Sequence, residues 1–310
     1  MNYSDFDHIL DEGKGRREAV RCAVVMPGDL EIMKALVRAH DEGLIQPILI
    51  GDRATIEPML IQLGLPTSLF RIYHEKHAQS AICLAIDMVF GGDAQCIMKG
   101  YIKTSEFLHE LLKHKNDFAA SEMISMISFR TLPNYHKIIA FTDTGICPHP
   151  SLEQKKAIIA NAVSIMRGMG IECPKVAAVT SSDYPSQKMP ESIDAAALQR
   201  MNECGEIKNC VIQGPMTIDM ALSRNQAARK GVKSQVAGDA DLVLFPDLAS
   251  ASITSRMVTY VTGSAPGTLV VGTRVPVIIC SRDSSAETKY LGITMAVASQ
   301  PQAVRQTAAE

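Results

Sequence analysis

The stretch "VPVIICSRDSSAETK", from Val275 to Lys289, places a short buried strand directly before a helix. Its first residues are mostly apolar or β-branched and too few for a helix, which indicates a strand. The polar residues that follow are typical of a helix N-terminus. This strand would carry the hydroxyl of Ser281 and the guanidinium of Arg282 at its carboxyl end.

Similar units of a strand followed by a helix occupy almost the whole chain. The runs "RCAVVM" (21–26), "QPILIG" (46–51) and "AQCIMKG" (94–100) each precede an amphipathic helical pattern. This alternation is typical of βαβ units on a largely parallel sheet covered on both faces, so the sequence predicts an α/β fold. About a dozen such strands are many for one open sheet, which favours two lobes with a cleft between them.

The composition is that of an ordinary globular protein. The chain has 310 residues, of which 46% are hydrophobic and 21% charged. A net charge of -2 with scattered lysines and arginines gives no basic surface for nucleic acid or membrane headgroups. The polar N-terminus and the lack of a long apolar run predict a cytoplasmic protein. Eight cysteines without a C-x-x-C pair predict buried thiols in a reducing compartment.

Ligands of open α/β sheets gather at the carboxyl ends of strands, so the residues there are the first candidates for a site. One arginine, one lysine, glycines and hydroxyls at these ends suit an oxyanion such as phosphate. The predicted strand ends carry Lys99-Gly100, Thr142-Asp143-Thr144-Gly145, Gly214-Pro215, Pro246-Asp247 and Ser281-Arg282.

Each candidate also has an ordinary structural role open to it. Arg282 and Lys99 could be solvated residues of strand–helix loops. Asp219 enters a helix that ends near Gly231, where basic residues would complement the helix dipole. The sequence predicts no metal site, because the histidine pairs at 74/77 and 109/114 have no third ligand at a matching spacing. No G-x-S-x-G or G-x-G-x-x-G motif occurs, which argues against hydrolase and nicotinamide chemistry.

Several blocks in register resemble the phosphate acetyltransferase and phosphate butyryltransferase family, most closely its butyryl branch. The blocks are "IMKGYIKTSEFL", "YHKIIAFTDTG", "PSLEQKKAIIANAV", "KMPESIDAAALQRM", "GEIKNCVIQGPMTIDMALS", "AARKGVKSQVAGDADLVLFPD" and "VVGTRVPVIICSRDSSAETK". The resemblance implies a two-lobed, three-layer α/β/α protein with mostly parallel sheets, of the isocitrate and isopropylmalate dehydrogenase-like fold. It also implies a homodimer with an interdomain cleft. We expect residues 1–147 plus 277–310 to form one lobe and residues 148–276 the other.

The reaction that the resemblance implies exchanges an acyl group between CoA and phosphate, which are substrates. No permanently bound cofactor, metal ion or covalent acyl-enzyme is implied. Arg282 and Ser281 would stabilise the charge that departing phosphate gains. Glu287 is the preferred base for the CoA thiol, and Asp283 the second candidate. The expected substrate-binding positions are Lys99, Gly100, Thr104, Ser125, Thr142, Asp143, Cys147, Gly214, Asp219, Ser252 and Ser285.

The chain departs from the butyryl branch where polar residues are usual. Met126 replaces a histidine, Cys147 and Met220 each replace an asparagine, and residues 249–252 read Ala-Ser-Ala-Ser instead of Glu-Ala-Gly-Asn. These changes predict either an altered acyl pocket or a catalytically weak protein that senses CoA or acyl phosphate. A decarboxylating dehydrogenase of the same fold is a third hypothesis, but the acidic residues that would hold its metal ion are not found.

Overall fold

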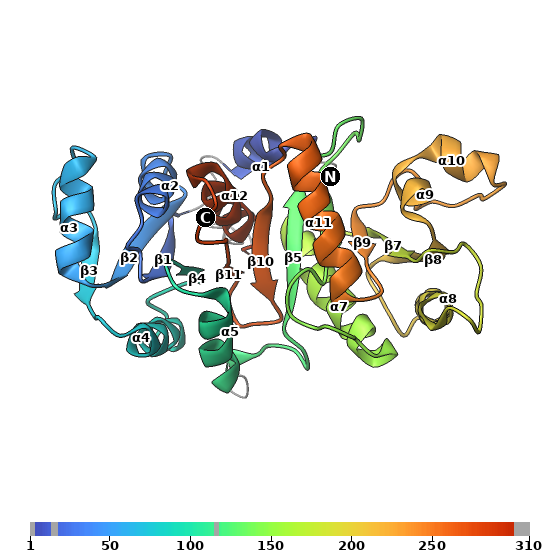
Figure 1. Ribbon diagram of the computed structural model, residues 1–310, viewed down its shortest axis with the longest axis horizontal. Coiled ribbons are helices and arrows are strands. Elements are labelled where there is room, and N and C mark those ends of the chain that lie inside the picture. The colour runs from blue at the N-terminus through green and yellow to red at the C-terminus, as the bar shows by residue number, and fades with distance from the viewer. Residues whose placement is uncertain (1–3, 14–17, 115–117, 301–310) are drawn as a thin grey trace, which may run out of the picture.

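The computed structural model describes residues 4–13, 18–114 and 118–300. Within them, eleven strands form one continuous sheet, in the order β3-β2-β1-β4-β11-β10-β5-β6-β9-β7-β8 (Figure 1). The strands are β1 (Val20–Val25), β2 (Ile45–Gly51), β3 (Arg71–His74), β4 (Cys96–Lys99), β5 (Ser125–Arg130), β6 (Ile139–Thr142), β7 (Lys175–Val179), β8 (Val211–Met216), β9 (Leu242–Leu244), β10 (Gly267–Val271) and β11 (Val277–Ile278).

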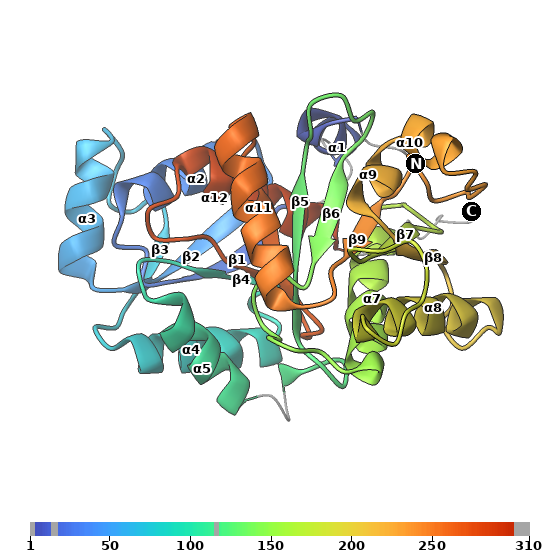
Figure 2. The same ribbon diagram turned by 45° about the vertical axis from the view of Figure 1, so that its right-hand side comes forward.

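The helices alternate with the strands as the sequence predicts, which confirms the α/β class. They are α1 (Phe6–Gly13), α2 (Leu30–Asp41), α3 (Arg53–Gln62), α4 (Ala78–Phe90), α5 (Thr104–Lys113), α7 (Leu152–Gly168), α8 (Pro190–Glu203), α9 (Ile218–Leu222), α10 (Arg224–Arg229), α11 (Leu248–Thr262) and α12 (Ala286–Ala298). Figure 2 shows α2 and α12 on one face of the sheet and α4 and α5 on the other. Among the described residues, no helix is both long and apolar enough to cross a bilayer.

The strands run in two directions, and this divides the sheet into halves. β3, β2, β1, β4 and β11 are mutually parallel. β10 is antiparallel to both β11 and β5, and β5 is antiparallel to β6. β6, β9, β7 and β8 are again mutually parallel. The carboxyl ends of the two parallel sets therefore lie at opposite edges of the sheet.

One continuous sheet differs from the expectation that so many strands would need two. Three antiparallel pairings, β11–β10, β10–β5 and β5–β6, join the halves, so the backbone ladder is continuous across all eleven described strands. The predicted lobe boundary at residue 147 falls in the loop after β6, and the lobe bounds stay a prediction.

The position of β11 fixes the geometry of the predicted site. Although they are 180 positions apart along the chain (278 minus 98), Ile278 is in register with Met98 of β4. The strand quoted at the start thus returns to the first half of the sheet. Ser285 then caps α12, its hydroxyl accepting a hydrogen bond from the backbone N–H of Thr288 at 3.3 Å.

Candidate active site

Lys99 ends β4 and lies beside the carboxyl end of β11. Its side chain is only 2% exposed, and its ammonium donates to the carbonyl oxygens of Gly100 at 3.0 Å and Ile102 at 3.1 Å. Burial lowers the pKa of Lys99 to about 8, and the positive charges of Lys289 and Arg282 act in the same direction. Lys99 therefore supports the backbone of residues 100–102 and adds positive potential beneath the surface.

Ser281, Arg282 and Asp283 lie exposed in the loop that follows β11. The Ser281 hydroxyl donates a hydrogen bond to the Asp283 carboxylate, which lowers the pKa of Asp283. The guanidinium carbon of Arg282 is 5.7 Å from the centre of the Tyr101 ring. Within the described chain, Arg282 makes no ion pair, so its fork of donors is open to a ligand.

Sequence reasoning missed Lys289, which belongs to the same group. Lys289 is 2% exposed, donates to the carbonyl oxygen of Ser284, and lies 3.6 Å from a carboxylate oxygen of Asp29. Asp29 is at the same time the N-cap of α2. In the sequence Lys289 reads as a helix lysine, and only the packing of α12 shows that it points inward. We call Lys99, Ser281, Arg282, Asp283 and Lys289 the β4–β11 cluster.

Glu287, the preferred base, faces a different helix. Its carboxylate accepts a hydrogen bond from Arg38 of α2 at 2.7 Å, and both side chains are about half exposed. The carboxylate is therefore held against α2 by a salt bridge. Asp283 is the carboxylate that shares a loop with Ser281 and Arg282.

A second group of predicted residues gathers where β6 ends and β5 begins. Ser125 and Thr142 are fully buried; the Ser125 hydroxyl accepts from the amide of Asn161, and Thr142 donates to the carbonyl oxygen of Met126. Asp143 follows Thr142 through a cis peptide bond. We call Ser125, Thr142, Asp143 and Cys147 the β6 loop cluster.

Asp143 organises this loop through its backbone. One carboxylate oxygen accepts from the N–H groups of Met126, Gly145 and Ile146 at 3.0–3.2 Å, and the other from that of Cys147 at 2.8 Å. Burial raises the pKa of Asp143, and these four donors oppose the rise. A carboxylate with both oxygens engaged is a structural anchor of the loop.

Cys147 carries no feature of an activated nucleophile. Burial and the nearby Asp143 charge raise the pKa of its thiol. Its sulfur lies 3.9 Å from the side-chain oxygen of Gln154. The raised pKa lowers the fraction of reactive thiolate; that no cysteine carries the acyl group stays a prediction.

The remaining predicted positions are spread along the sheet. Gly100 is required by space, because a Cβ there would lie 2.2 Å from the carbonyl oxygen of Met26. Gly214 packs closely against Ala178: a Cβ added to Gly214 would lie 2.7 Å from the Cβ of Ala178. Asp219 is exposed at the start of α9, while Thr104 of α5 and Ser252 of α11 are half-buried.

Two of the unusual apolar residues are core residues. Met126 is 7% exposed and packs with the side chains beneath the first half of the sheet, and Met220 is 1% exposed in the corresponding cluster under the second half. The Met126 sulfur also lies 2.4 Å from where a Cβ on Gly145 would be, so it fills the space beside the loop. Both replacements are therefore packing changes.

A separate basic cavity of about 480 Å³ lies on the second half of the sheet, lined in part by Lys175, Arg224 and Lys233. Asp239 also lines it and pairs with Lys175 and with Arg224, the latter at 3.4 Å. Asp239 pairs with two of these three cations, whereas Arg282 makes no ion pair within the described residues, so we rank this cavity below the β4–β11 cluster as an anion site.

The chain is similar to known proteins over nearly its full length. The family described as phosphate acetyl/butaryl transferase matches residues 69–297. A phosphate butyryltransferase of Clostridium acetobutylicum is 33% identical, covering 94% of this chain and 96% of its own. A phosphate acetyltransferase of Thermotoga maritima is 31% identical, covering 92% of this chain and 96% of its own.

Solved structures show the same fold. A branched-chain phosphotransacylase from Enterococcus faecalis superposes with a TM-score of 0.80 at 23% identity, covering 90% of this chain and 98% of its own. A 4-hydroxythreonine-4-phosphate dehydrogenase from Klebsiella pneumoniae superposes with a TM-score of 0.58 at 12% identity. The match covers 91% of this chain and 98% of the dehydrogenase chain. The dehydrogenase-like fold is thus confirmed. With its family profile and its relatives in agreement, the chain belongs to the phosphate acetyl/butyryl transferase family and is an acyltransferase.

Proposed function

We propose that this protein exchanges a short acyl group between CoA and phosphate, with phosphate bound at the β4–β11 cluster. The observation that carries the assignment is the unpaired guanidinium of Arg282 above two buried lysines, Lys99 and Lys289. The carboxylates of Asp29 and Asp283 offset these three positive charges only in part, which leaves a local field for an anion. The lobe bounds expected from the sequence, 1–147 plus 277–310 and 148–276, would put this cluster at the cleft.

The proposed reaction proceeds by direct transfer. The CoA thiol loses its proton to a carboxylate, and the thiolate attacks the carbonyl carbon of the acyl phosphate. The new C–S bond forms, the C–O bond to phosphate breaks, and phosphate leaves with the electron pair of that bond. Arg282 and nearby backbone N–H groups stabilise the charge that develops on phosphate, and the Ser281 hydroxyl turns from Asp283 to donate to phosphate when it binds.

Asp283 is favoured over Glu287 as the base by its contacts, in contrast to the preference drawn from the sequence. Glu287 is occupied by Arg38, whereas Asp283 shares its loop with the residues that would hold phosphate. Comparing kcat of Asp283→Asn with that of Glu287→Gln tests this choice. Loss of a general base typically costs about 100-fold or more, so the variant with the larger fall identifies the base.

A butyryl-like or branched acyl group is favoured over acetyl. The support is the similarity to a phosphate butyryltransferase. The test is thiol release from acetyl-, butyryl- and isobutyryl-CoA in the presence of phosphate. A kcat/KM highest for acetyl-CoA would overturn the preference and leave the reaction class intact.

The second candidate function is a catalytically weak protein that senses CoA. It is favoured by the positions where this chain lacks the polar residues usual in the butyryl branch, at Met126, Cys147, Met220 and residues 249–252. The burial of Met126 and Met220 reduces that support, because core residues do not contact a substrate directly. Calorimetry with CoA beside the same acyl-CoA panel separates the candidates. Tight CoA binding without turnover of any acyl-CoA would favour the sensor.

We further propose a homodimer formed through α11. Ile253, Met257, Tyr260 and Val261 are 69%, 59%, 89% and 70% exposed and follow a helical spacing along one side of α11. α11 lies at the surface in both views (Figures 1 and 2). Such a stripe is typical of a surface covered by a partner. Light scattering should give twice the chain mass for the wild type and the chain mass for Tyr260→Asp; a monomeric wild type would contradict the proposal.

The eight cysteines support the cytoplasmic location expected from the sequence. All eight are free thiols in the structure, as in a reducing compartment. Fractionation of cells that produce the full chain would test the location.

A further inference from the structure

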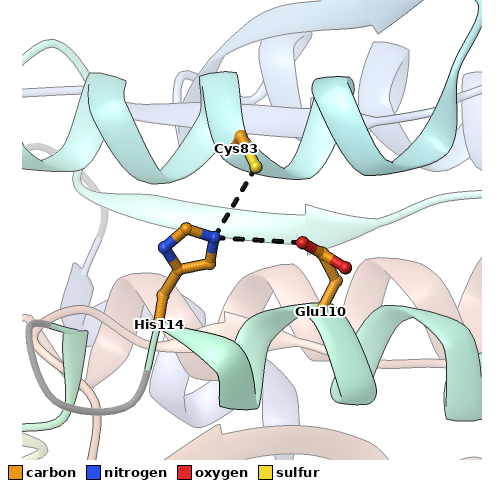
Figure 3. Close-up of side chains that lie close together, drawn as sticks. All are labelled: Cys83, Glu110 and His114. Atoms are coloured by element: carbon orange, nitrogen blue, oxygen red, sulfur yellow. Dashed lines mark hydrogen bonds and ion pairs between the residues drawn. The ribbon is translucent and has the colours of Figure 1, made fainter.

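Cys83, Glu110 and His114 bring three kinds of metal ligand together between two helices (Figure 3). Cys83 lies on α4, while Glu110 and His114 are one helical turn apart at the end of α5. Their ligand atoms all lie within 4.8 Å of one another. Spacing along the sequence indicates that His109 and His114 lie near each other. It cannot indicate that Cys83 lies beside them, because Cys83 is on a different helix.

The spacing of the ligand atoms suits a tetrahedral ion. Zinc bonds of about 2.3 Å to sulfur and about 2.0 Å to nitrogen put those two atoms about 3.5 Å apart. The sulfur of Cys83 and Nε2 of His114 are 3.6 Å apart. Nε2 and the nearer carboxylate oxygen of Glu110 are 4.0 Å apart, too far for a hydrogen bond and slightly wide for a shared ion. A small rotation of the Glu110 side chain would close that gap.

The surroundings hold the carboxylate in a suitable orientation. Glu110 is 7% exposed, and its Oε2 accepts a hydrogen bond from Lys113 at 2.7 Å. Its Oε1 faces His114 and accepts from the amide of Gln79 at 3.2 Å. Contacts of this kind orient metal ligands in known sites. Cys83 and His114 are half-buried, which leaves one side open for water as a fourth ligand.

We propose that Cys83, Glu110 and His114 bind one Zn²⁺, which links α4 to α5. A thiolate, an imidazole and a carboxylate together favour zinc over magnesium or calcium, which prefer oxygen ligands alone. On binding, the Cys83 thiol releases its proton to solvent and the thiolate sulfur bonds to the ion. The site is separate from the β4–β11 cluster and takes no part in the proposed acyl transfer.

Titration of the full-length, reduced protein with CoCl₂ tests the site, because Co²⁺ reports its ligands in its absorption spectrum. We expect one equivalent to bind, with a sulfur-to-cobalt charge-transfer band that one equivalent of ZnCl₂ removes. Cys83→Ser should lose the band, and His114→Gln should weaken Co²⁺ binding about 10- to 100-fold. ZnCl₂ should raise the melting temperature of the wild type but not that of Cys83→Ser.

Matched controls separate this site from exposed thiols and histidines. Cys173→Ser removes an exposed thiol, and His109→Gln an exposed histidine of α5, so both should retain the band and the affinity. The proposal is overturned by a wild type without the band. It is equally overturned by a band that persists in Cys83→Ser or disappears in Cys173→Ser.

Discussion

Lys99 and Lys137 are equally buried lysines in opposite halves of the sheet, each 2% exposed, with opposite surroundings. Lys137 lies 2.5 Å from a carboxylate oxygen of Asp241 and 3.1 Å from one of Asp239. Lys99 contacts two backbone carbonyl oxygens and, among the described residues, no carboxylate. The charge of Lys137 is thus neutralised by carboxylates, whereas the ammonium of Lys99 is held by backbone carbonyl oxygens, and we propose that bound phosphate offsets its charge.

The charges next to each lysine extend this difference. Asp239 also binds His136 at 2.8 Å and contacts Lys175, so the second half contains a closed ionic network. Lys99 instead has Arg282 and Lys289 as its charged neighbours, and both lower its pKa further. Neighbouring positive charges repel one another and lower stability, but together they attract an anion. We infer that the network serves folding and that the β4–β11 cluster serves anion binding.

Arg282→Ala should have the largest effect on activity. Removing one strong donor to a developing oxyanion typically costs about 100- to 1000-fold in turnover. Arg282→Lys keeps the charge but loses the planar fork, so it should recover only part of the rate. CoA affinity, measured by calorimetry, should change little in either variant. Loss of CoA binding with near-normal turnover at saturating CoA would instead assign Arg282 to the nucleotide end of CoA.

Asp239→Asn should destabilise the protein by about 2–3 kcal/mol, because the buried Lys137 then has Asp241 alone and the partly buried Lys175 loses its ion-pair partner. Urea unfolding measures the change, and kcat below the unfolding transition should remain near that of the wild type. Arg224→Gln is the control, since this partner is 73% exposed and its loss should cost under about 1 kcal/mol. A stable Asp239→Asn variant with a large fall in kcat would place the active site at the network.

Lys99→Met should flatten the pH dependence of stability between about pH 8 and 10.5. The folded pKa of Lys99, about 8, lies below its ordinary value of 10.5, so the unfolded chain binds more protons in this window. The stability of the wild type relative to the variant should therefore rise with pH there, by roughly 2–3 kcal/mol. Urea unfolding at pH 7 and pH 10 measures it, and equal changes in both proteins would contradict the lowered pKa.

Cys147→Ser should have the smallest effect. The thiol has a raised pKa and contacts Gln154 only weakly, so turnover should stay within about threefold of the wild type. Rapid-quench kinetics should show no burst that labels the protein. Complete loss of turnover in a folded variant would point to a covalent acyl-cysteine.

The alternation of strands and helices was predictable, and so was the placement of Ser281-Arg282 at a strand end. Both follow from local patterns of apolar and polar residues within a few turns of chain. The register of β11 beside β4 was not predictable from pattern alone, because it depends on how distant strands pair. The position of this strand was expected from the family resemblance, which implied that residues 277–310 join residues 1–147 in one lobe.

Contacts between helices were beyond prediction for the same reason. Nothing in the sequence near Glu287 indicates that Arg38, far earlier in the chain, would bind it. Lys289 was not among the predicted site residues, because its inward position depends on the packing of α12. Cys83 is a candidate ligand only because α4 lies beside α5. Local pattern specifies the elements, whereas burial and pairing of charges depend on their assembly.

Phosphate binding measured by calorimetry, without CoA, tests the central claim most directly. The wild type and Arg224→Ala should bind inorganic phosphate equally, with an affinity that falls as salt rises. Arg282→Ala should bind about 10- to 100-fold more weakly, the loss expected for a charge-assisted pair of hydrogen bonds. Phosphate binding that survives in Arg282→Ala but disappears in Arg224→Ala would contradict the account and assign the anion to the basic cavity on the other half of the sheet.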